Sequence, residues 1–185
     1  NVRKRLANSR FSGRAEELRA LRAAVTDPAR LKTVRVSGEP GVGKSRLVLQ
    51  RLTMDQRGAV LEAEGLSHDR SPVGSLIRAL KGYLALGDRD GVREVGDKLR
   101  TLLEDLGLGQ EESPLRALLD LPVEDPVWLE LDPAQRRQRI YRAFRSLVES
   151  VARVGEVVLV CDDLQWFDAD SIDVLHFLVA NVEAR

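Results

Sequence analysis

The chain has 185 residues and carries 29 Lys and Arg side chains against 29 Asp and Glu, so its formal net charge is zero. A hydrophobic fraction of 43% and a charged fraction of 31% indicate a packed core and exclude a disordered chain. The neutral balance lacks the electrostatic footprint of a nucleic-acid binder, so we expect no direct nucleic-acid binding by this segment. No apolar run reaches the about 18 residues that cross a bilayer. The single cysteine favours a reducing compartment, so we expect a cytoplasmic protein without a membrane partner.

The first third of the chain predicts two helices and two strands. Residues 1–10 are basic and irregular and are interpreted as a linker. Apolar residues recur at helical spacing over 14–25. Residues 33–37 are short, β-branched and alternating, which predicts a strand, and a Gly-rich segment follows. A helical run then ends before Gly58, and residues 59–64 predict a second strand.

The middle of the chain, residues 65–155, is predicted to be a helical block. Ser71 and Pro72 are expected to be the N-cap and first residue of one helix, and residues 92–106 predict another, closed by Gly107. A turn-rich stretch around three prolines interrupts the pattern. Asp132 and Pro133 then begin a long helix that ends at Gly155. The three prolines are Pro114, Pro122 and Pro126.

The last part of the chain predicts a buried strand and a helix. Residues 157–161 form an unbroken apolar run, typical of a strand buried on both faces of a parallel sheet. A helix is expected from Ser171 to about residue 183. The order of elements predicts an α/β fold with a parallel sheet and a helical insertion.

The segment after the first strand carries the clearest chemical motif. It reads Gly38-Glu39-Pro40-Gly41-Val42-Gly43-Lys44-Ser45 and fits the P-loop pattern G-x-x-x-x-G-K-[ST]. Glycines allow consecutive backbone N–H groups to turn inward on an anion, and the following helix adds the positive end of its dipole. Lys44 is expected to bind the β- and γ-phosphates of ATP, and the Ser45 hydroxyl to bind Mg²⁺. We include the next residue, Arg46, among the nucleotide-binding candidates.

Two acids follow the apolar strand. Asp162 and Asp163 are placed at the carboxyl end of a buried strand, where α/β sheets bind ligands. Asp162 is the candidate Mg²⁺ ligand, directly or through water, and Asp163 the candidate group that orients or deprotonates the attacking water. A surface turn or an N-cap remains the alternative for each, more so for Asp163.

Other polar and aromatic residues favour structural roles. Cys161 is interpreted as a small buried hydrophobe, and His68 and His176 are too isolated to suggest a zinc site. Trp166 and Phe167 are expected to pack under the following helix, which Asp168 and Asp170 are expected to cap. Five arginines on one helix favour a solvated face, with an arginine finger or a partner surface as the alternative. They are Arg136, Arg137, Arg139, Arg142 and Arg145.

With these residues in hand, the chain resembles the AAA-type ATPase module of STAND signalling proteins. The resemblance rests on FSGRAEEL at residues 11–18, on the P-loop, and on LVCDDLQWFD at residues 159–168. Such modules occur in large LuxR-type transcriptional regulators and in multidomain class III adenylate/guanylate cyclases. The stretches ALLDLPVEDPVW (117–128) and LDPAQRRQR (131–139) look more like the cyclase-associated branch.

The resemblance implies a P-loop NTPase fold, a three-layer parallel sheet, and further binding residues. It implies that Phe11, Gly13 and Arg14 lie beside the adenine. It also implies that Lys44 acts in catalysis together with Asp163, and that the output domains are attached in the same polypeptide. Many relatives have His at the position of Gln165 and a small residue at that of Phe167.

The resemblance also implies that the chain is an N-terminal fragment. The family's sheet has a strand between the P-loop strand and the acidic strand, followed by a sensor residue and a winged-helix lid. These are absent from the sequence, so residues 11–185 are expected to be a partial ATPase domain with its C-terminal strands missing. An isolated fragment of this kind is expected to be unstable.

Three functions follow as hypotheses. The leading one is an ATP-dependent switch that binds ATP or ADP, hydrolyses ATP slowly and regulates attached sensor and output domains. The alternatives are a P-loop kinase or other phosphotransferase, and a scaffold that binds nucleotide without turnover.

Overall fold

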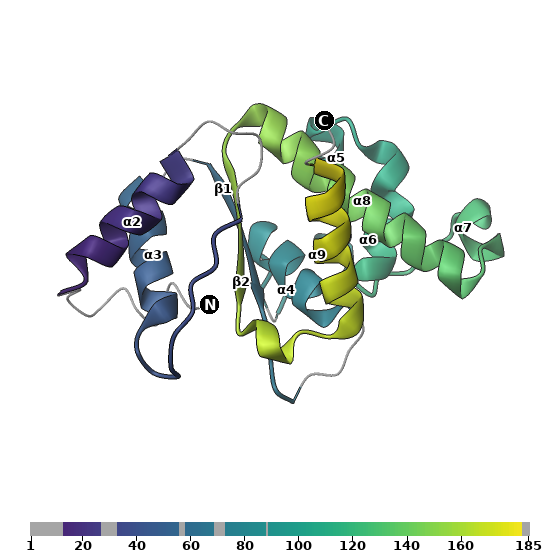
Figure 1. The fold of residues 1–185 in the computed structure, drawn as a ribbon. Coiled ribbons are helices and arrows are strands. Elements are labelled where there is room, and N and C mark those ends of the chain that lie inside the picture. The colour runs from purple at the N-terminus through teal and green to yellow at the C-terminus, as the bar shows by residue number, and fades with distance from the viewer. Residues whose placement is uncertain (1–12, 27–32, 56–57, 69–72, 88, 183–185) are drawn as a thin grey trace. The chain divides into compact units, whose positions relative to one another are not determined.

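The computed structural model describes residues 13–26, 33–55, 58–68, 73–87 and 89–182 (Figure 1). The chain divides into two compact units. The first comprises residues 1–57 with 179–185, and the second comprises residues 58–178.

The first unit contains two helices that contact each other. Helix α2 spans Ala15–Thr26 and helix α3 spans Lys44–Asp55, both close to their predicted bounds. The helix prediction from periodicity is therefore confirmed in this unit. The strand predicted at residues 33–37 is not formed, since residues 33–39 have no regular secondary structure. A β-branched, alternating segment becomes a strand only when a neighbouring strand satisfies its backbone groups, and no described residue pairs with this one.

The sheet that the described residues form lies in the second unit. Strand β1 (Ala59–Glu64) pairs in parallel with strand β2 (Val157–Asp162), and Glu64 lies opposite Asp162 at their carboxyl ends. Both strands and the parallel character of the sheet are as predicted, whereas the pairing of β1 with β2 was not predicted from the sequence. The expectation that β2 is buried on both faces is wrong, because every residue of β2 is only half-buried in a sheet of two strands.

Helices occupy most of the chain between the two strands and follow β2 (Figure 1). They are α4 (Gly74–Tyr83), α5 (Val92–Asp105), α6 (Glu112–Leu118), α7 (Pro126–Glu130), α8 (Pro133–Val154) and α9 (Ala169–Val182), with short 3-10 turns η1 (Gly109–Glu111) and η2 (Leu164–Trp166). The predicted helical character of residues 65–155 agrees with these elements. Residues 71 and 72 lie outside the described part of the chain.

One hydrophobic core joins these helices to the sheet. Leu61 and Ala63 of β1 and the alternate residues Leu159 and Cys161 of β2 face it, because side chains alternate along a strand. The helices contribute fully buried leucines and one phenylalanine. These are Leu76, Leu80, Leu99, Leu103, Leu115, Leu118, Phe144 and Leu147. The core therefore holds β1, β2 and helices α4, α5, α6, α8 and α9 together.

The ends of three helices can be compared with the helix caps predicted from the sequence. Asp132 caps α8 through a capping box, in which its carboxylate accepts a hydrogen bond from the Gln135 N–H at 2.8 Å and the Gln135 side-chain oxygen accepts one from the Asp132 N–H at 3.0 Å. Gly155 ends α8 and Gly107 closes α5, both as predicted. The prediction for α4 is wrong: its N-cap is Val73 rather than Ser71.

The turn-rich stretch predicted around the prolines contains helices. Pro114 lies in the first turn of α6, and Pro126 is the first residue of α7, which Asp125 caps. A proline in the first turn of a helix loses no hydrogen bond, because the N–H groups there have no intrahelical partner. These prolines therefore begin helices instead of breaking them.

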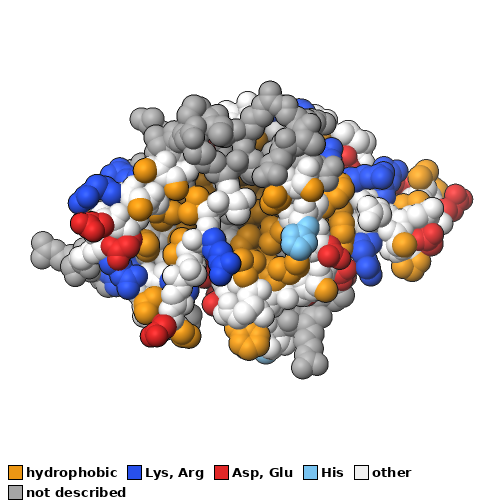
Figure 2. Space-filling view, viewed as in Figure 1, with side chains coloured by type: hydrophobic (Ala, Val, Ile, Leu, Met, Phe, Trp, Pro, Cys, Tyr) orange, Lys and Arg blue, Asp and Glu red, His pale blue; other side chains and the backbone are white. Residues whose placement is uncertain are grey.

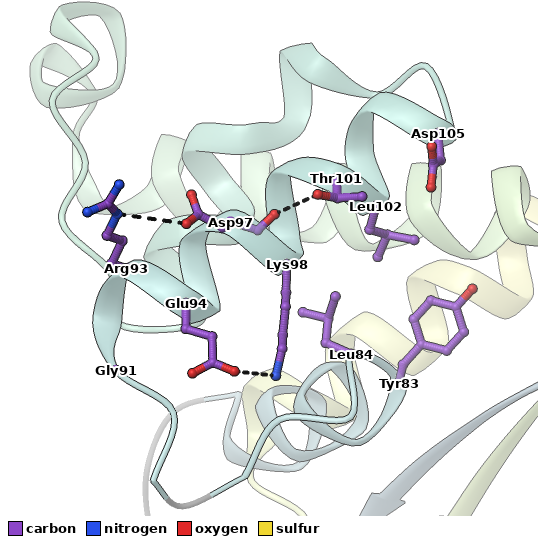
Figure 3. Close-up of a pocket in the computed structure, with 10 residues that line it drawn as sticks. All are labelled: Tyr83, Leu84, Gly91, Arg93, Glu94, Asp97, Lys98, Thr101, Leu102 and Asp105. Carbon is purple, nitrogen blue, oxygen red and sulfur yellow. Dashed lines mark hydrogen bonds and ion pairs between the residues drawn. The ribbon is translucent and has the colours of Figure 1, made fainter.

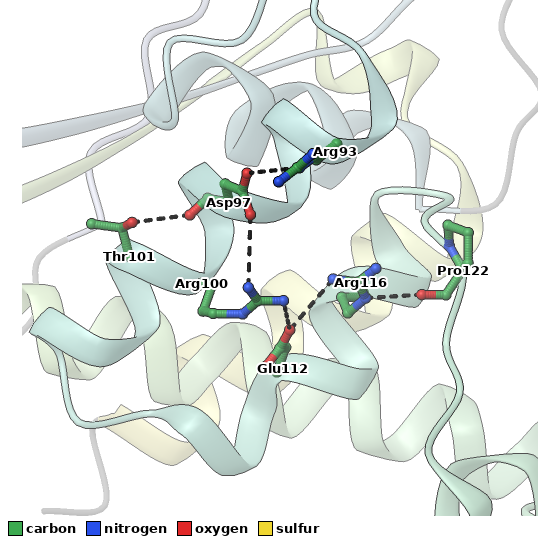
Figure 4. Close-up of polar contacts among 7 residues, drawn as sticks. All are labelled: Arg93, Asp97, Arg100, Thr101, Glu112, Arg116 and Pro122. Atoms are coloured by element: carbon green, nitrogen blue, oxygen red, sulfur yellow. Dashed lines mark hydrogen bonds and ion pairs between the residues drawn. The ribbon is translucent and has the colours of Figure 1, made fainter.

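Charged side chains tie α5 to α6 at the surface. Arg100 lies 3.7 Å from both Asp97 and Glu112, and Glu112 also pairs with Arg116 at 3.4 Å (Figure 4). Arg116 in turn donates to the carbonyl of Pro122. On the face in Figure 2, acidic and basic side chains of the described residues are interspersed, which agrees with the neutral composition.

Candidate nucleotide site: the phosphate loop and the acidic turn

The P-loop residues form an open turn directly before α3. Gly41 and Gly43 have φ angles of 80° and 88°, a left-handed conformation that favours glycine. A Cβ added at either glycine would meet no atom within 4 Å, so the loop leaves room beside its backbone. Helix α3 begins at Lys44, and the Leu47 N–H donates to the Gly43 carbonyl at 3.0 Å. Left-handed glycines and open space beside the backbone are two features that an anion-binding turn requires.

Lys44 is held by the loop itself. Its ammonium donates to the carbonyl oxygens of Gly38 and Glu39, at 3.1 and 3.0 Å. Both partners are neutral carbonyls, so these two hydrogen bonds do not neutralise the lysine charge. A lysine beside the N-terminus of a helix is a combination that can bind phosphate, so Lys44 stays a candidate phosphate-binding residue.

The remaining candidates of the first unit are placed as follows. Ser45 and Arg46 are half-buried in the first turn of α3. Gly13 and Arg14 are exposed and left-handed, with φ of 80° and 57°, directly before α2. Phe11 lies outside the described residues. The adenine contacts implied by the family resemblance therefore stay a prediction.

The second candidate cluster is the turn after β2, residues 162–168, called here the acidic turn. The carboxylate of Asp162 accepts a hydrogen bond from the Asp163 N–H at 3.1 Å, and the carboxylate of Asp163 accepts one from the Gln165 side-chain amide at 2.9 Å. Asp163 is exposed and left-handed, with φ of 53°. A non-glycine residue there costs on the order of 1 kcal/mol and persists only where its surroundings hold it.

Gly65, which follows β1, lies directly against the acidic turn. Its N–H donates to the Asp162 carbonyl at 3.0 Å, which extends the pairing of β1 with β2 by one residue. A Cβ at this position would overlap the carbonyl oxygen of Asp163 and press on Trp166 and Phe167. Sequence reasoning did not single out Gly65, because only the folded backbone shows the close approach.

The two aromatic residues of the acidic turn, Trp166 and Phe167, differ in burial. Phe167 packs against the hydrophobic core, as predicted, whereas Trp166 is 51% exposed, so its predicted packing under α9 is wrong. The 3-10 turn η2 that follows the left-handed Asp163 contains Trp166, and Phe167, directly after it, is the aromatic that reaches the core.

Asp168 confirms the capping prediction for α9. Its carboxylate accepts hydrogen bonds from the Ser171 N–H at 2.8 Å and from the Ser171 hydroxyl at 2.6 Å. Asp170 instead accepts from the Tyr141 hydroxyl and lies 3.3 Å from Arg137. The second capping candidate is thus bound to α8.

The arginines of α8 are largely committed to local contacts. Arg136 donates to the Leu129 carbonyl and lies over the buried Trp128 ring. Arg145 pairs with Glu149 at 3.2 Å and lies over Phe177. Arg139 and Arg142 are exposed, as expected for a solvated face.

Cys161 packs against the core, and burial raises the pKa of its thiol to about 11. A thiol in that state is neutral at physiological pH and a poor nucleophile, which agrees with the structural role predicted for it. Among the described residues, no three His, Cys, Asp or Glu side chains gather into a metal cage.

A shallow groove of about 820 Å³ lies between the end of α4 and α5 (Figure 3). Tyr83 and Leu84 line one side, and its lysine, Lys98, is paired with Asp90 at 2.8 Å and Glu94 at 3.0 Å. No residue of the P-loop or of the acidic turn lines this groove.

Comparison with known proteins identifies the family. The family model described as the AAA ATPase domain matches residues 10–185. The chain belongs to this family. The AAA ATPase domain is an α/β P-loop module that binds nucleotide, which agrees with the loop geometry and the parallel strands. The same comparison found no curated protein and no solved structure that matches this chain. No helix among its described residues is long and apolar enough to cross a membrane.

Proposed function

We propose that this AAA ATPase domain binds Mg²⁺-ATP through residues 38–46 and hydrolyses it slowly. Lys44 and the N–H groups of the loop bind the phosphates, and Ser45 and Asp162 hold the metal ion. The observation that carries the proposal is the loop itself, which is open beside two left-handed glycines and holds a lysine against its own carbonyls. Bound Mg²⁺ supplies charge that stabilises phosphoryl transfer.

In this proposal Asp163 orients the attacking water. Its carboxylate is exposed and accepts a hydrogen bond from the Gln165 amide, and an ionised carboxylate has further lone pairs that can accept from water. A left-handed Asp at the end of a strand also agrees with a functional role, because backbone strain concentrates at such sites. Slow turnover suits a switch better than a metabolic enzyme.

We further propose that the domain is a signalling switch that regulates attached sensor and output domains, either a cyclase or a LuxR-type regulator. The support is the resemblance of residues 117–128 and 131–139 to the cyclase-associated branch of STAND modules. The nucleotide state would change how the module packs against those domains. The unpaired cysteine supports a cytoplasmic location.

One pair of variants in the full-length protein tests this function. Lys44→Ala is expected to abolish nucleotide binding, and Asp163→Asn to keep binding while losing phosphate release. Phosphate release by Asp163→Asn at the wild-type rate would remove Asp163 from the mechanism. Labelled phosphate appearing on a second molecule would favour a kinase, and Lys44-dependent binding without release would favour a scaffold.

A further inference from the structure

The acidic turn is anchored at both of its ends. At its start, the Asp162 carbonyl accepts from the Gly65 N–H. At its end, Asp168 accepts from the Val73 N–H at 2.9 Å, across 95 residues of sequence. The same carboxylate caps α9 through Ser171. One side chain thus joins the end of the turn to the beginning of two helices.

The beginning of α4 is itself tied to β1. The Glu64 carbonyl accepts from the Arg78 guanidinium at 2.8 Å and from the Ser75 hydroxyl at 3.3 Å, and Ser75 is 1% exposed. Arg78 also donates to Ser75. Glu64 directly precedes Gly65. The contacts therefore close a ring that runs from β1 through α4 and Asp168 back along the acidic turn to β1.

Two strained residues lie on this ring. Val73 has φ of 54° and Asp163 has φ of 53°. The left-handed conformation is a genuine outlier for a β-branched residue such as valine. Strained residues persist where their surroundings over-determine them. At Val73 the Asp168 carboxylate binds the backbone N–H, so this contact is one of the restraints that hold the strained conformation.

We propose that Asp168 is a positioning residue for hydrolysis, a conclusion that rests on the proposed function of Asp163. The turn between the two aspartates is short, so anchoring its ends limits the directions in which the Asp163 carboxylate can point. Loss of the Asp168 contacts frees the end of the turn and lets that carboxylate move. Nucleotide binding is the task of residues 38–46 and is unaffected.

The test compares Asp168→Ala with Asp168→Asn in the full-length protein. Phosphate release is measured per bound nucleotide, so that a loss of folded protein does not count as a loss of rate. Asp168→Ala is expected to lower the rate by about 10- to 100-fold with unchanged ATP affinity, since a misplacement near 1 Å can cost that much. Asp168→Asn keeps an oxygen that can accept from the backbone N–H groups of Val73 and Ser171 and is expected to restore most of the rate.

A double-mutant comparison separates positioning from general damage. If Asp168 acts through Asp163, adding Asp168→Ala to Asp163→Asn lowers the residual rate no further, whereas independent effects add. Ser171→Ala keeps both backbone contacts and is expected to behave like Asp168→Asn. Asp170→Asn is the matched control, because this acid lies two residues further on, in the first turn of α9, but binds Tyr141 and Arg137.

The outcomes distinguish this inference from the function on which it rests. If wild-type release depends on Lys44 and Asp163 but Asp168→Ala releases phosphate at the wild-type rate per site, the positioning role is wrong and the function stands. An additive double variant, or no rescue by Asp168→Asn, also overturns the positioning role. Should wild-type protein show no Lys44-dependent release, the proposed function fails and the role of Asp168 fails with it.

Discussion

Gly65 lies against the backbone carbonyl of Asp163, so closely that the two residues could not keep their positions if Gly65 carried a side chain. The contact is with backbone, which cannot swing aside as a flexible side chain can. Asp163 is also the candidate water-orienting residue. The close approach therefore makes Gly65 sensitive to the smallest substitution.

Gly65→Ala is expected to move the acidic turn and lower phosphate release at least tenfold, with ATP affinity unchanged. The measurement is release per bound nucleotide. Gly82→Ala is the control. Gly82 lies in helix α4, and a Cβ added there would meet no atom within 4 Å. That control is expected to be stabilising by up to about 1 kcal/mol. Wild-type turnover in Gly65→Ala would contradict the close approach.

The ends of α4 and α5 offer a matched test of backbone strain. Both helices end in the same motif, with left-handed Ala85 after α4 and left-handed Gly107 after α5, at φ of 51° and 66°. In each case the next N–H reaches back to a carbonyl of the helix, Leu86 to Lys81 and Leu108 to Leu103.

Ala85→Gly is expected to stabilise the protein by about 1 kcal/mol, because glycine adopts this conformation without the steric cost of a Cβ. Ala85 is exposed, so no packing is lost. Gly107→Ala is expected to destabilise by a similar amount, since a Cβ there meets no atom within 4 Å and strain alone decides the sign. Urea unfolding measures both, and changes of the same sign in the two variants would contradict this account.

Cys161 gives a pH-dependent test, because it is the only cysteine in the chain. Burial raises the pKa of its thiol from 9.0 to about 11. A raised pKa adds stability that is fully present below pH 9 and is lost as the pH rises through 11. Labelling with iodoacetamide at pH 8 is expected to be far slower in native protein than in urea. Equal rates in native and unfolded protein would show that the thiol is exposed.

The two tryptophans report on different regions. Trp128 is 6% exposed and lies under Arg136, whereas Trp166 is 51% exposed in the acidic turn. Acrylamide is expected to quench the fluorescence of Trp128→Phe, which keeps Trp166, more strongly than that of Trp166→Phe. If the turn senses nucleotide, Mg²⁺-ATP changes the Trp166 signal and leaves the Trp128 signal constant. The reverse quenching order would contradict the exposure of the turn.

Much of the fold could be predicted from short sequence patterns. The strand at 157–162 follows from an apolar, β-branched run and the capped helix after Asp132 from an Asp-Pro pair, both of which act within a few residues. Residues 33–37 carry an equally good strand pattern and form none. The strands 59–64 and 157–162 pair with each other, whereas no described residue pairs with residues 33–37. Such pairing joins segments far apart in the sequence, so a short stretch of sequence does not predict it.

The candidate site shows the same division. The P-loop residues and the acidic pair could be named from their motifs, and the Asp168 cap from its position before a helix. The contacts of Gly65 with Asp163 and of Asp168 with Val73 could not, because they join segments about 100 residues apart. The roles of Phe11, Gly13 and Arg14 and the attached domains stay predictions.

Direct binding of a fluorescent ATP analogue to the full-length protein, with and without Mg²⁺, tests the central claim most directly. Wild-type protein and Lys81→Ala, which removes an exposed lysine of α4, are expected to bind saturably and more tightly with Mg²⁺. Lys44→Ala is expected to lose binding by at least 100-fold, since about 3 kcal/mol of charge-assisted contact disappears. Equal affinity of Lys44→Ala and wild type would contradict nucleotide binding by the loop.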